Sequence, residues 1–284
     1  MALAKSAPHV AAVHDLSGMG RCSLSVVLPV LSAMGCWCSP LPTAYLSACT
    51  IFPPSQRFVF RDLTQEMEGS AGHWEELGVR FDALYSGFVG SEQQIRLLRE
   101  LMIRFRGENT LVLVDPVMGD WGKPYRTYTP AMCREMKGLA ALADVITPNL
   151  TEAAILLGEK YENAPTSEAG LQEWLERLSL EGRRSVILTG IRPRPGYLGA
   201  ACWDRKRGAC FLSSVHEEPA QFPGTGDLFA SVALGALLSG KSLEDATALA
   251  VEFIGQCARR TLALGTPIEE GVQFEGLLGR LMEP

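Results

Sequence analysis

The sequence lacks the features that would place a protein in a membrane or on a nucleic acid. No window approaches the ~20 apolar residues of a membrane-spanning helix, and residues 1–12 have too short an apolar core for a signal peptide. The formal net charge is −6, and lysine and arginine form no stripe interleaved with aromatic residues. We therefore expect a cytoplasmic protein with neither membrane nor nucleic acid as a partner.

Cysteine is present, but not in a pattern that forms metal hooks or a disulfide scaffold. The eight cysteines include no pair of Cys-x-x-Cys motifs, so we expect reduced, mostly buried thiols.

Basic residues gather only in two short clusters, Arg183-Arg184 and Arg192-Pro193-Arg194. We interpret both clusters as solvated surface; a cluster with a further role would most naturally cover an anionic ligand.

The composition is that of a folded, globular protein. Of its 284 residues, 47% are hydrophobic and 20% are charged, and the 28 glycines and 17 prolines are scattered along the chain. The chain has no linker-like stretch and no internal repeat. Residues 1–284 are therefore predicted to form one domain, a size at which roughly 75% of the unfolded surface becomes buried.

Short apolar runs alternate with helical patterns through the first two thirds of the chain. Residues 10–14 and 25–34 read as a strand and a helix that are joined by a glycine turn. The unit recurs, with strands at 81–85, 110–114, 145–146 and 186–188 and helices at 91–105, 130–142, 151–157 and 167–180. This alternation predicts an α/β fold, a three-layer α/β/α sandwich with a mostly parallel central sheet.

The pattern changes after Gly196. Residues 197–203 and 209–215 flank a polar turn, which predicts a hairpin appended to the parallel sheet. The remaining chain is nearly all helical in pattern, with helices expected at 226–239 and 242–263.

The run from Gly235 to Ser242 matches the P-loop pattern letter for letter. A P-loop must follow a strand, whereas Gly235 lies inside a predicted helix. We therefore interpret Gly240 as the end of that helix and Ser242 as the N-cap of the next one, and discount a P-loop.

Polar residues follow nearly every predicted strand. Ligands bind at the carboxyl ends of the strands in open parallel sheets, so these positions are candidates for a site. They are Asp15 and Ser17, Ser86 and Gly87, Asp115 and Pro116, Thr147 to Asn149, and Thr189 and Gly190. One such residue alone is typical of a turn, but a row of them along one sheet edge predicts a binding site.

The sharpest motif is Pro223-Gly224-Thr225-Gly226-Asp227, which precedes a helical apolar pattern. Its two glycines are expected to let the backbone turn tightly, so that the helix N-terminus presents free amides to a phosphoryl group. Asp227 would reach the attacking hydroxyl and accept its proton as the new bond forms. The motif predicts an ATP-dependent kinase for a primary alcohol on a small molecule, with Asp227 as the base.

Two further patterns bear on cofactors. Asn149 and Glu152 begin a predicted helix, where they can hold Mg²⁺ through waters or act as a helix cap, and the two roles are compatible. Gly18-Met19-Gly20 begins a dinucleotide-binding fingerprint, but Ser23 stands where that fingerprint requires glycine. We therefore discount a dehydrogenase.

Four motifs in order resemble the vitamin-kinase branch of the ribokinase superfamily, and specifically pyridoxal and pyridoxamine kinases. They are the opening strand with its glycine turn, Asp-Pro-Val-Met-Gly-Asp at 115–120, Thr-Pro-Asn-Leu-Thr-Glu-Ala at 147–153 and Gly-Thr-Gly-Asp at 224–227. The resemblance covers residues 10 to about 261. The last motif discriminates, because similar hydroxymethylpyrimidine kinases usually carry cysteine in place of Asp227 and sugar kinases usually carry alanine in place of Thr225.

The resemblance implies a ribokinase-like fold, a homodimer and the ATP-dependent phosphorylation of the 5'-hydroxymethyl group of a B6 vitamer (pyridoxal, pyridoxamine or pyridoxine) in pyridoxal 5'-phosphate salvage. It implies Asp227 as proton acceptor beside an anion hole of Gly224, Thr225 and Gly226. The implied nucleotide-binding residues are Asp115, Asn149, Glu152, Thr189 and Thr225. The implied ligands for Mg²⁺ and for a monovalent cation, K⁺ or Na⁺, are Glu152, Asp115 and Thr147. The implied substrate-binding residues are Asp15, Ser17, Thr50 and Phe88.

Two departures from the family pattern leave the substrate open. The first motif, Asp15-Leu16-Ser17-Gly18, is closer to the Asp-Pro-Ser-Gly of pyrimidine kinases than to the Ser-His of many pyridoxal kinases, and Cys49 replaces a common histidine. A hydroxymethylpyrimidine kinase of thiamine synthesis is therefore the alternative. A ligand-binding relative without activity is a third possibility, against which the intact motif at 224–227 argues.

Overall fold

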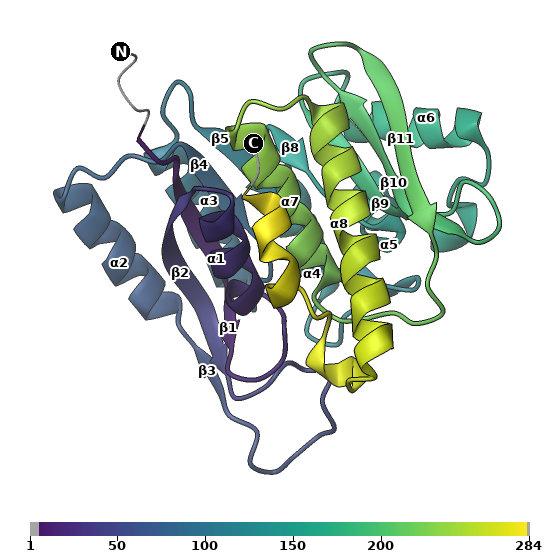
Figure 1. Ribbon diagram of the computed structural model, residues 1–284. Helices are drawn as coiled ribbons and strands as arrows, with labels where there is room; N and C mark the ends of the chain where they lie inside the picture. Colours follow the sequence, from purple (N-terminus) through teal and green to yellow (C-terminus); the bar gives the residue numbers. More distant parts are fainter. Residues whose placement is uncertain (1–5, 283–284) are drawn as a thin grey trace, which may run out of the picture.

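The computed structural model describes residues 6–282 of the chain. One nine-stranded sheet runs through it (Figure 1). Six neighbouring strands are parallel, in the sheet order β9 (Ser185–Ile191), β8 (Val145–Ile146), β5 (Leu111–Val114), β4 (Ala83–Ser86), β1 (His9–Ser17) and β2 (Trp37–Leu46). Antiparallel strands flank this set, with β3 (Phe60–Asp62) beside β2 and the hairpin of β10 (Tyr197–Asp204) and β11 (Ala209–His216) beside β9.

Helices cover both faces of the sheet, which confirms the predicted three-layer α/β/α sandwich with a mostly parallel sheet (Figure 1). One face carries α1 (Leu24–Ala33), α7 (Thr225–Leu238) and α8 (Leu243–Leu264). The other carries α2 (Thr64–Glu76), α3 (Glu92–Phe105), α4 (Pro130–Ala140), α5 (Leu150–Leu157) and α6 (Glu168–Leu178). A small hairpin of β6 (Gly119–Asp120) and β7 (Lys123–Pro124) and the 3₁₀ helices η1 (Tyr161–Asn163), η2 (Ile268–Glu270) and η3 (Glu275–Leu281) complete the described elements.

The hydrophobic core has two halves, one on each face of the sheet. Strand β1 contributes side chains to both halves, because successive side chains of a strand point to opposite faces of the sheet. Val10 and Ala12 pack with α1 and α7, whereas Ala11 and Val13 pack with α3 and α4. Burial on both faces explains why the central strands read as continuous apolar runs in the sequence.

The predicted strands and helices are present, with ends that shift by a few residues. Strand β1 continues to Ser17 because its ladder with β2 extends that far. Asp15 and Ser17 therefore lie inside the end of β1, and the prediction that they follow the strand was wrong. In the same way, Thr189 lies inside β9, which runs to Ile191.

The sequence patterns missed the region from β2 to α2. Strand β2 contains Pro40 and Pro42 and is only partly buried, so it resembles neither a buried nor an alternating strand. Helix α2 buries only Thr64, Met67 and Ala71. A strand with prolines and a helix with a narrow apolar stripe carry weak local signals, and packing against the sheet decides their structure.

The P-loop-like run spans the end of α7 and the N-cap of α8, as predicted. Gly235 lies inside α7 and Ser242 is the N-cap of α8, where its side chain accepts a hydrogen bond from the backbone amide of Asp245.

No helix in the described part of the chain is long and apolar enough to cross a membrane. The ends of the predicted 1–284 domain, residues 1–5 and 283–284, lie outside the described residues, and the domain count stays a prediction.

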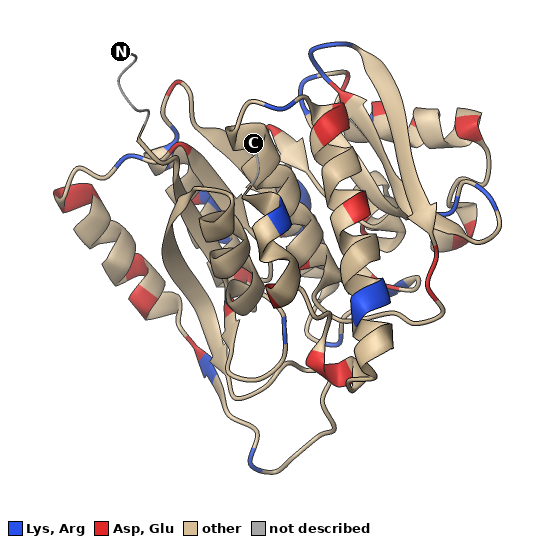
Figure 2. Ribbon diagram, viewed as in Figure 1, with Lys and Arg blue, Asp and Glu red and all other residues tan. Residues whose placement is uncertain are grey.

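Charged residues lie on the outer helices and in the loops (Figure 2). Arg184 is an exception, because it is only 5% exposed. Its guanidinium donates hydrogen bonds to the carbonyl oxygens of Leu178 and Ala140. The prediction of a solvated surface was wrong for Arg184, which instead ties α6 and α4 to the start of β9.

Candidate active site

A pocket of about 400 Å³ opens at the carboxyl ends of β5, β8 and β9, beside the N-termini of α5 and α7. Its location is the one expected for a ligand site in an open parallel sheet. Nine predicted site residues line it: Asp115, Thr147, Asn149, Glu152, Thr189, Gly224, Thr225, Gly226 and Asp227. The structure therefore brings together residues that are spread over more than a hundred positions of the chain.

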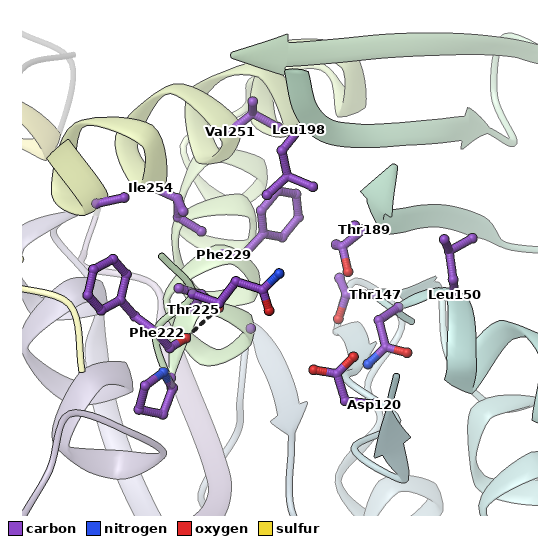
Figure 3. A pocket seen from close by; sticks show the side chains of 18 of the residues that line it. Asp120, Thr147, Leu150, Thr189, Leu198, Phe222, Thr225, Phe229, Val251 and Ile254 are labelled. Carbon is purple, nitrogen blue, oxygen red and sulfur yellow. Dashed lines mark hydrogen bonds between the residues drawn. The ribbon is translucent and has the colours of Figure 1, made fainter. Parts of the chain in front are cut away.

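The pocket has one apolar wall and one polar wall (Figure 3). The apolar wall comes from β10, α7, α8 and the segment before α7, and its labelled members are Leu198, Phe222, Phe229, Val251 and Ile254. The polar wall includes Thr147, Thr189 and Asp120 from the strand ends and the β6–β7 hairpin. A ligand with a flat apolar part and a charged part suits this division.

The turn before α7 requires glycine at position 224. Gly224 has φ 75°, and a Cβ atom there would lie 1.9 Å from the carbonyl oxygen of Arg21. Gly226 lies inside the first turn of α7, and the nearest atom to a Cβ there would be Asp115 Oδ2 at 3.9 Å. The prediction that both glycines serve the turn was therefore wrong for Gly226, which instead leaves open space in front of Asp115.

The N-terminus of α7 presents backbone amides to the pocket. The first hydrogen bond along α7 runs from the Leu228 amide to the Gly224 carbonyl at 3.0 Å, so the amides of residues 225–227 precede the helical ladder. The Thr225 hydroxyl donates to the Phe222 carbonyl at 3.2 Å and braces the turn (Figure 3). Free amides and the positive end of the helix dipole favour a negatively charged group here.

Asp227 lies in the first turn of α7 with its side chain 15% exposed. Its Oδ2 accepts a hydrogen bond from the Ser23 amide at 2.8 Å. Burial raises the pKa of Asp227 to about 8, and the nearby Asp115 and Asp15 carboxylates add to the increase. A carboxylate with a pKa close to neutral pH accepts a proton more readily than an ordinary aspartate does.

Ser23 holds Asp227 through a strained backbone. It is the N-cap of α1 with φ 50° and ψ −135°, a conformation that non-glycine residues rarely adopt. Its hydroxyl donates to Asp15, which also accepts a hydrogen bond from the Ser17 hydroxyl at 3.1 Å. Asp15 and Ser17 are therefore linked to Asp227 through Ser23. In the sequence, Ser23 stands out only as a residue in the place of a fingerprint glycine, because a positive φ leaves no signal at a serine.

Asp115 and Thr147 form a buried pair on the floor of the pocket. The Thr147 hydroxyl donates to Asp115 Oδ1 at 3.0 Å, and burial raises the pKa of Asp115 to about 7. Both residues are at most 6% exposed. The other oxygen of Asp115 faces Gly226 in the first turn of α7.

Glu152 and Asn149 form the predicted cap of α5. The Asn149 side chain accepts from the Glu152 amide at 3.0 Å, and Glu152 Oε2 accepts from the Asn149 amide at 2.8 Å. Glu152 Oε1 accepts from the Met118 amide at 3.1 Å. Burial, helped by the Asp115 carboxylate, raises the pKa of Glu152 well above its ordinary value. Glu152 therefore holds the start of α5 and the backbone at Met118 in place.

A cation suits this cluster of carboxyl groups. Asp115, Glu152 and Asp227 all have raised pKa values, and a bound cation would favour their ionised forms. Within residues 6–282, no three His, Cys, Asp or Glu side chains come close enough to hold a metal ion by themselves. A Mg²⁺ ion here would therefore be held largely through waters and phosphate oxygens, which is usual for this ion.

The β6–β7 hairpin forms a rim of the pocket that no sequence motif indicates. The Asn149 side chain donates to the Gly119 carbonyl at 2.9 Å, which fixes the hairpin above the start of α5. Trp121, with φ 53° and 57% exposure, stands at the hairpin tip. The guanidinium of Arg192, one of the predicted basic clusters, lies 5.9 Å from the Trp121 ring centre and pairs with Glu217. Trp121, Arg192 and Glu217 all line the pocket.

The four predicted substrate residues are not among those that line this pocket. Asp15 and Ser17 are each 4% exposed and lie on the β1 side of Asp227. Thr50 is exposed in a turn after β2, and Phe88 is partly buried against the core on the α3 side of the sheet. Their roles therefore stay predictions.

Comparison with known proteins identifies the family. Residues 76–271 match the phosphomethylpyrimidine kinase family, which is more than half of the chain. The chain belongs to this family. It is also 31% identical to a pyridoxal kinase of Arabidopsis thaliana over 185 residues, which cover 62% of this chain and 58% of the plant protein. For three curated relatives, the matched region spans 47%, 64% and 58% of their length.

Solved structures extend the similarity over nearly the whole chain. A Bacteroides thetaiotaomicron protein, provisionally named phosphomethylpyrimidine kinase and solved with pyridoxal, is 41% identical with a TM-score of 0.92, covering 98% of this chain and 96% of that chain. The pyridoxal kinase of Lactobacillus plantarum is 30% identical with a TM-score of 0.88, covering 97% and 96%. The resemblance to pyridoxal kinases and the ribokinase-like fold are confirmed.

Proposed function

We propose that this protein is an ATP-dependent kinase that phosphorylates the 5'-hydroxymethyl group of a B6 vitamer. The observation that carries the proposal is the position of Asp227, a carboxylate in the first turn of α7, at the free amides of the Gly224 turn and in the pocket at the strand ends. The relative solved with pyridoxal, 41% identical over nearly the whole chain, supports the choice of substrate.

The site's own groups divide the work of phosphoryl transfer. The amides of residues 225–227 stabilise negative charge on the transferring phosphoryl group, because they are already oriented and cost no reorganisation. Asp227 orients the substrate hydroxyl and accepts its proton late, as suits a loose transition state. Burial raises the pKa of Asp227 to about 8, and a bound cation nearby would restore the ionised form that accepts the proton.

The polar wall would bind the nucleotide and its metals. Asp115, Asn149, Glu152 and Thr189 would face the phosphates and Mg²⁺, whose chemistry is to neutralise the phosphate charge. Thr147, hydrogen-bonded to Asp115, would contribute to a site for K⁺ or Na⁺. The apolar wall of β10, α7 and α8 would hold the base.

A hydroxymethylpyrimidine kinase is the second candidate. It is favoured by the family that the chain matches and by the Asp15-Leu16-Ser17-Gly18 motif. Both reactions transfer a phosphoryl group to a hydroxymethyl group on a six-membered aromatic ring, so the machinery around Asp227 serves either of them.

A side-by-side assay separates the candidates. The protein is incubated with ATP and Mg²⁺ and with pyridoxal, pyridoxamine, pyridoxine or hydroxymethylpyrimidine, and kcat/KM is measured for each. We expect the highest value for a B6 vitamer. A higher kcat/KM for hydroxymethylpyrimidine would show that the protein is a hydroxymethylpyrimidine kinase of thiamine synthesis. If none of the four substrates gives an ATP-dependent product, the protein is a non-catalytic relative.

A homodimer and a cytoplasmic location belong to the same proposal. The homodimer rests on the resemblance to pyridoxal kinases, and the location rests on the composition of the sequence. Sedimentation equilibrium of the purified protein tests the dimer, for which the mass should be twice the 30.8 kDa of one chain. Fractionation of cells that express it tests the location.

A further inference from the structure

A buried histidine lies directly behind Asp227. His14, on β1, has a side chain with 0% exposure, and its Nδ1 lies 3.8 Å from Asp227 Oδ1. Neither of its ring nitrogens has a hydrogen-bond partner among the described residues. The ring is neutral at neutral pH, because burial lowers the pKa of His14 to about 3.

The ring is held in place by its neighbours. It packs edge-on against Tyr85, with ring centres 4.4 Å apart and planes at 74°. On another side lies Gly87, where a Cβ atom would come within 2.3 Å of His14 Nδ1. The absence of a side chain at Gly87 therefore makes room for the ring beside Asp227. The titratable groups that face the ring are Tyr85 on β4 and Asp227 on α7, and Asp15 is the next residue along β1.

An unpartnered neutral imidazole at this depth needs an explanation. A polar group that is buried without a hydrogen bond loses its contacts with water and gains none in return, so such groups are rare in folded proteins. Tyr85 and Gly87 offer the ring only packing contacts, and the carboxyl oxygen that lies within 4 Å of Nδ1 is Asp227 Oδ1. The 3.8 Å separation is too long for a hydrogen bond, but contacts of this kind often shorten when substrate binds.

We propose that His14 is a positioning residue for Asp227. Its neutral ring carries a proton on Nδ1, and this N–H group donates a hydrogen bond to Asp227 Oδ1 when the substrate is bound. The inference rests on the proposed kinase function. Ser23 holds Oδ2 and His14 holds Oδ1, so two donors orient the carboxylate from the β1–α1 side. The remaining lone pairs of the carboxylate then face the pocket, where the substrate hydroxyl approaches.

Steady-state kinetics of two His14 variants test the donor role. His14→Leu keeps a similar side-chain volume without any N–H group, and kcat should fall roughly 10- to 100-fold, as for a lost hydrogen bond to a charged group. The KM for ATP should not change, because His14 does not line the pocket. His14→Asn can place an amide N–H near the position of Nδ1 and should restore most of the lost turnover.

Each kinetic outcome decides the matter. Wild-type kcat in His14→Leu, or equal losses in the leucine and asparagine variants, would overturn the donor role. Thermal unfolding of each variant identifies a loss that comes from misfolding.

Nitrogen NMR of the wild-type protein tests the same contact without relying on activity or on a His14 variant. The chain has only four histidines, so ¹⁵N-histidine labelling gives a spectrum in which His14 can be assigned. With pyridoxal present, we expect a neutral His14 with the proton on Nδ1, and a change in its Nδ1 resonance in Asp227→Ala. A proton on Nε2, or an Nδ1 resonance that is the same in the wild type and in Asp227→Ala, contradicts the inference. If the wild type phosphorylates no substrate, the proposed function fails while this measurement still decides the His14 contact.

Discussion

Asp227 lies between two regions that hold it by different means. On the α7 side, the backbone does the work: Gly224 turns the chain and the amides of residues 225–227 face the pocket. On the β1–α1 side, buried side chains and a strained backbone hold Asp227. Ser23 donates hydrogen bonds to Asp227 Oδ2 and to Asp15, and His14 faces Asp227 Oδ1. The anion-binding half therefore depends on backbone geometry, whereas the half that orients the base depends on particular buried groups.

The largest expected effect comes from the residue that both regions share. Asp227→Asn should keep nucleotide affinity but lower kcat by roughly 10²–10⁴, the usual contribution of a positioned acid–base group. The measurements are kcat with the preferred substrate and ATP affinity by calorimetry. Turnover close to that of the wild type would exclude the assigned role.

A matched pair of glycine variants tests the backbone half. Gly224→Ala should lower the free energy of unfolding by about 1–3 kcal/mol or more, because the new Cβ meets the Arg21 carbonyl and φ is 75°. Gly226→Ala is the control, since its Cβ has 3.9 Å to the nearest atom. Its stability should match or exceed that of the wild type, while its methyl group in front of Asp115 lowers activity. Urea denaturation that finds the two variants equally stable would break the comparison.

The pH dependence of stability tests the burial of Asp227. The folded-state pKa is raised from 3.8 to about 8, so the folded protein retains a proton that the unfolded chain releases. The resulting stability is fully present below about pH 4 and is lost as the pH rises towards 8. Asp227→Asn removes this dependence and should gain stability relative to the wild type at pH 8 but not at pH 4. Thermal unfolding at several pH values measures the difference, and parallel curves for the two proteins would refute it.

Two substitutions at Ser23 test the strained backbone on the β1–α1 side. Ser23→Ala and Ser23→Gly both lose the hydroxyl that donates to Asp15, but only glycine relieves φ 50°. The glycine variant should therefore be more stable than the alanine variant by about 1 kcal/mol or more. Both keep the amide that donates to Asp227, so kcat should differ little between them. Chemical denaturation with parallel kinetics checks this, and an alanine variant at least as stable as the glycine variant would show that no strain is stored.

The smallest effect on turnover is expected at the cap of α5. Glu152→Gln keeps the size of the side chain, but its amide group can accept only one of the two hydrogen bonds from the Met118 and Asn149 amides, so the free energy of unfolding should fall by about 1–3 kcal/mol. The loss of a negative charge beside Asp115 should raise the Mg²⁺ concentration needed for half-maximal activity. A Mg²⁺ titration of activity makes the measurement. If the titration is unchanged, Glu152 acts as a cap and not as a metal residue.

The elements and motifs of the site were predictable because they depend on nearby residues. The apolar runs before Asp115, Thr147 and Thr189 predicted neighbouring strands, and the apolar spacing after Gly224 predicted the start of α7, which the structure confirms. The region from β2 to α2 was not predictable, since Pro40 and Pro42 disguise a strand that pairs with β1. Trp121 on the pocket rim was missed as well, because no local pattern marks a rim, and the Arg192 cluster was interpreted as solvated surface with the covering of an anionic ligand as its alternative role.

The sequence by itself determined the alternation of strands and helices, the polar strand ends and the glycine that turns the chain before α7. These properties follow from side-chain periodicity and backbone conformational preference over a few residues. Only the tertiary structure decided what Asp227 touches, since Ser23 lies 204 positions away in the chain and His14 lies farther still. It also decided the raised pKa of that carboxylate, because desolvation depends on which segments fold over a group and not on its neighbours in sequence.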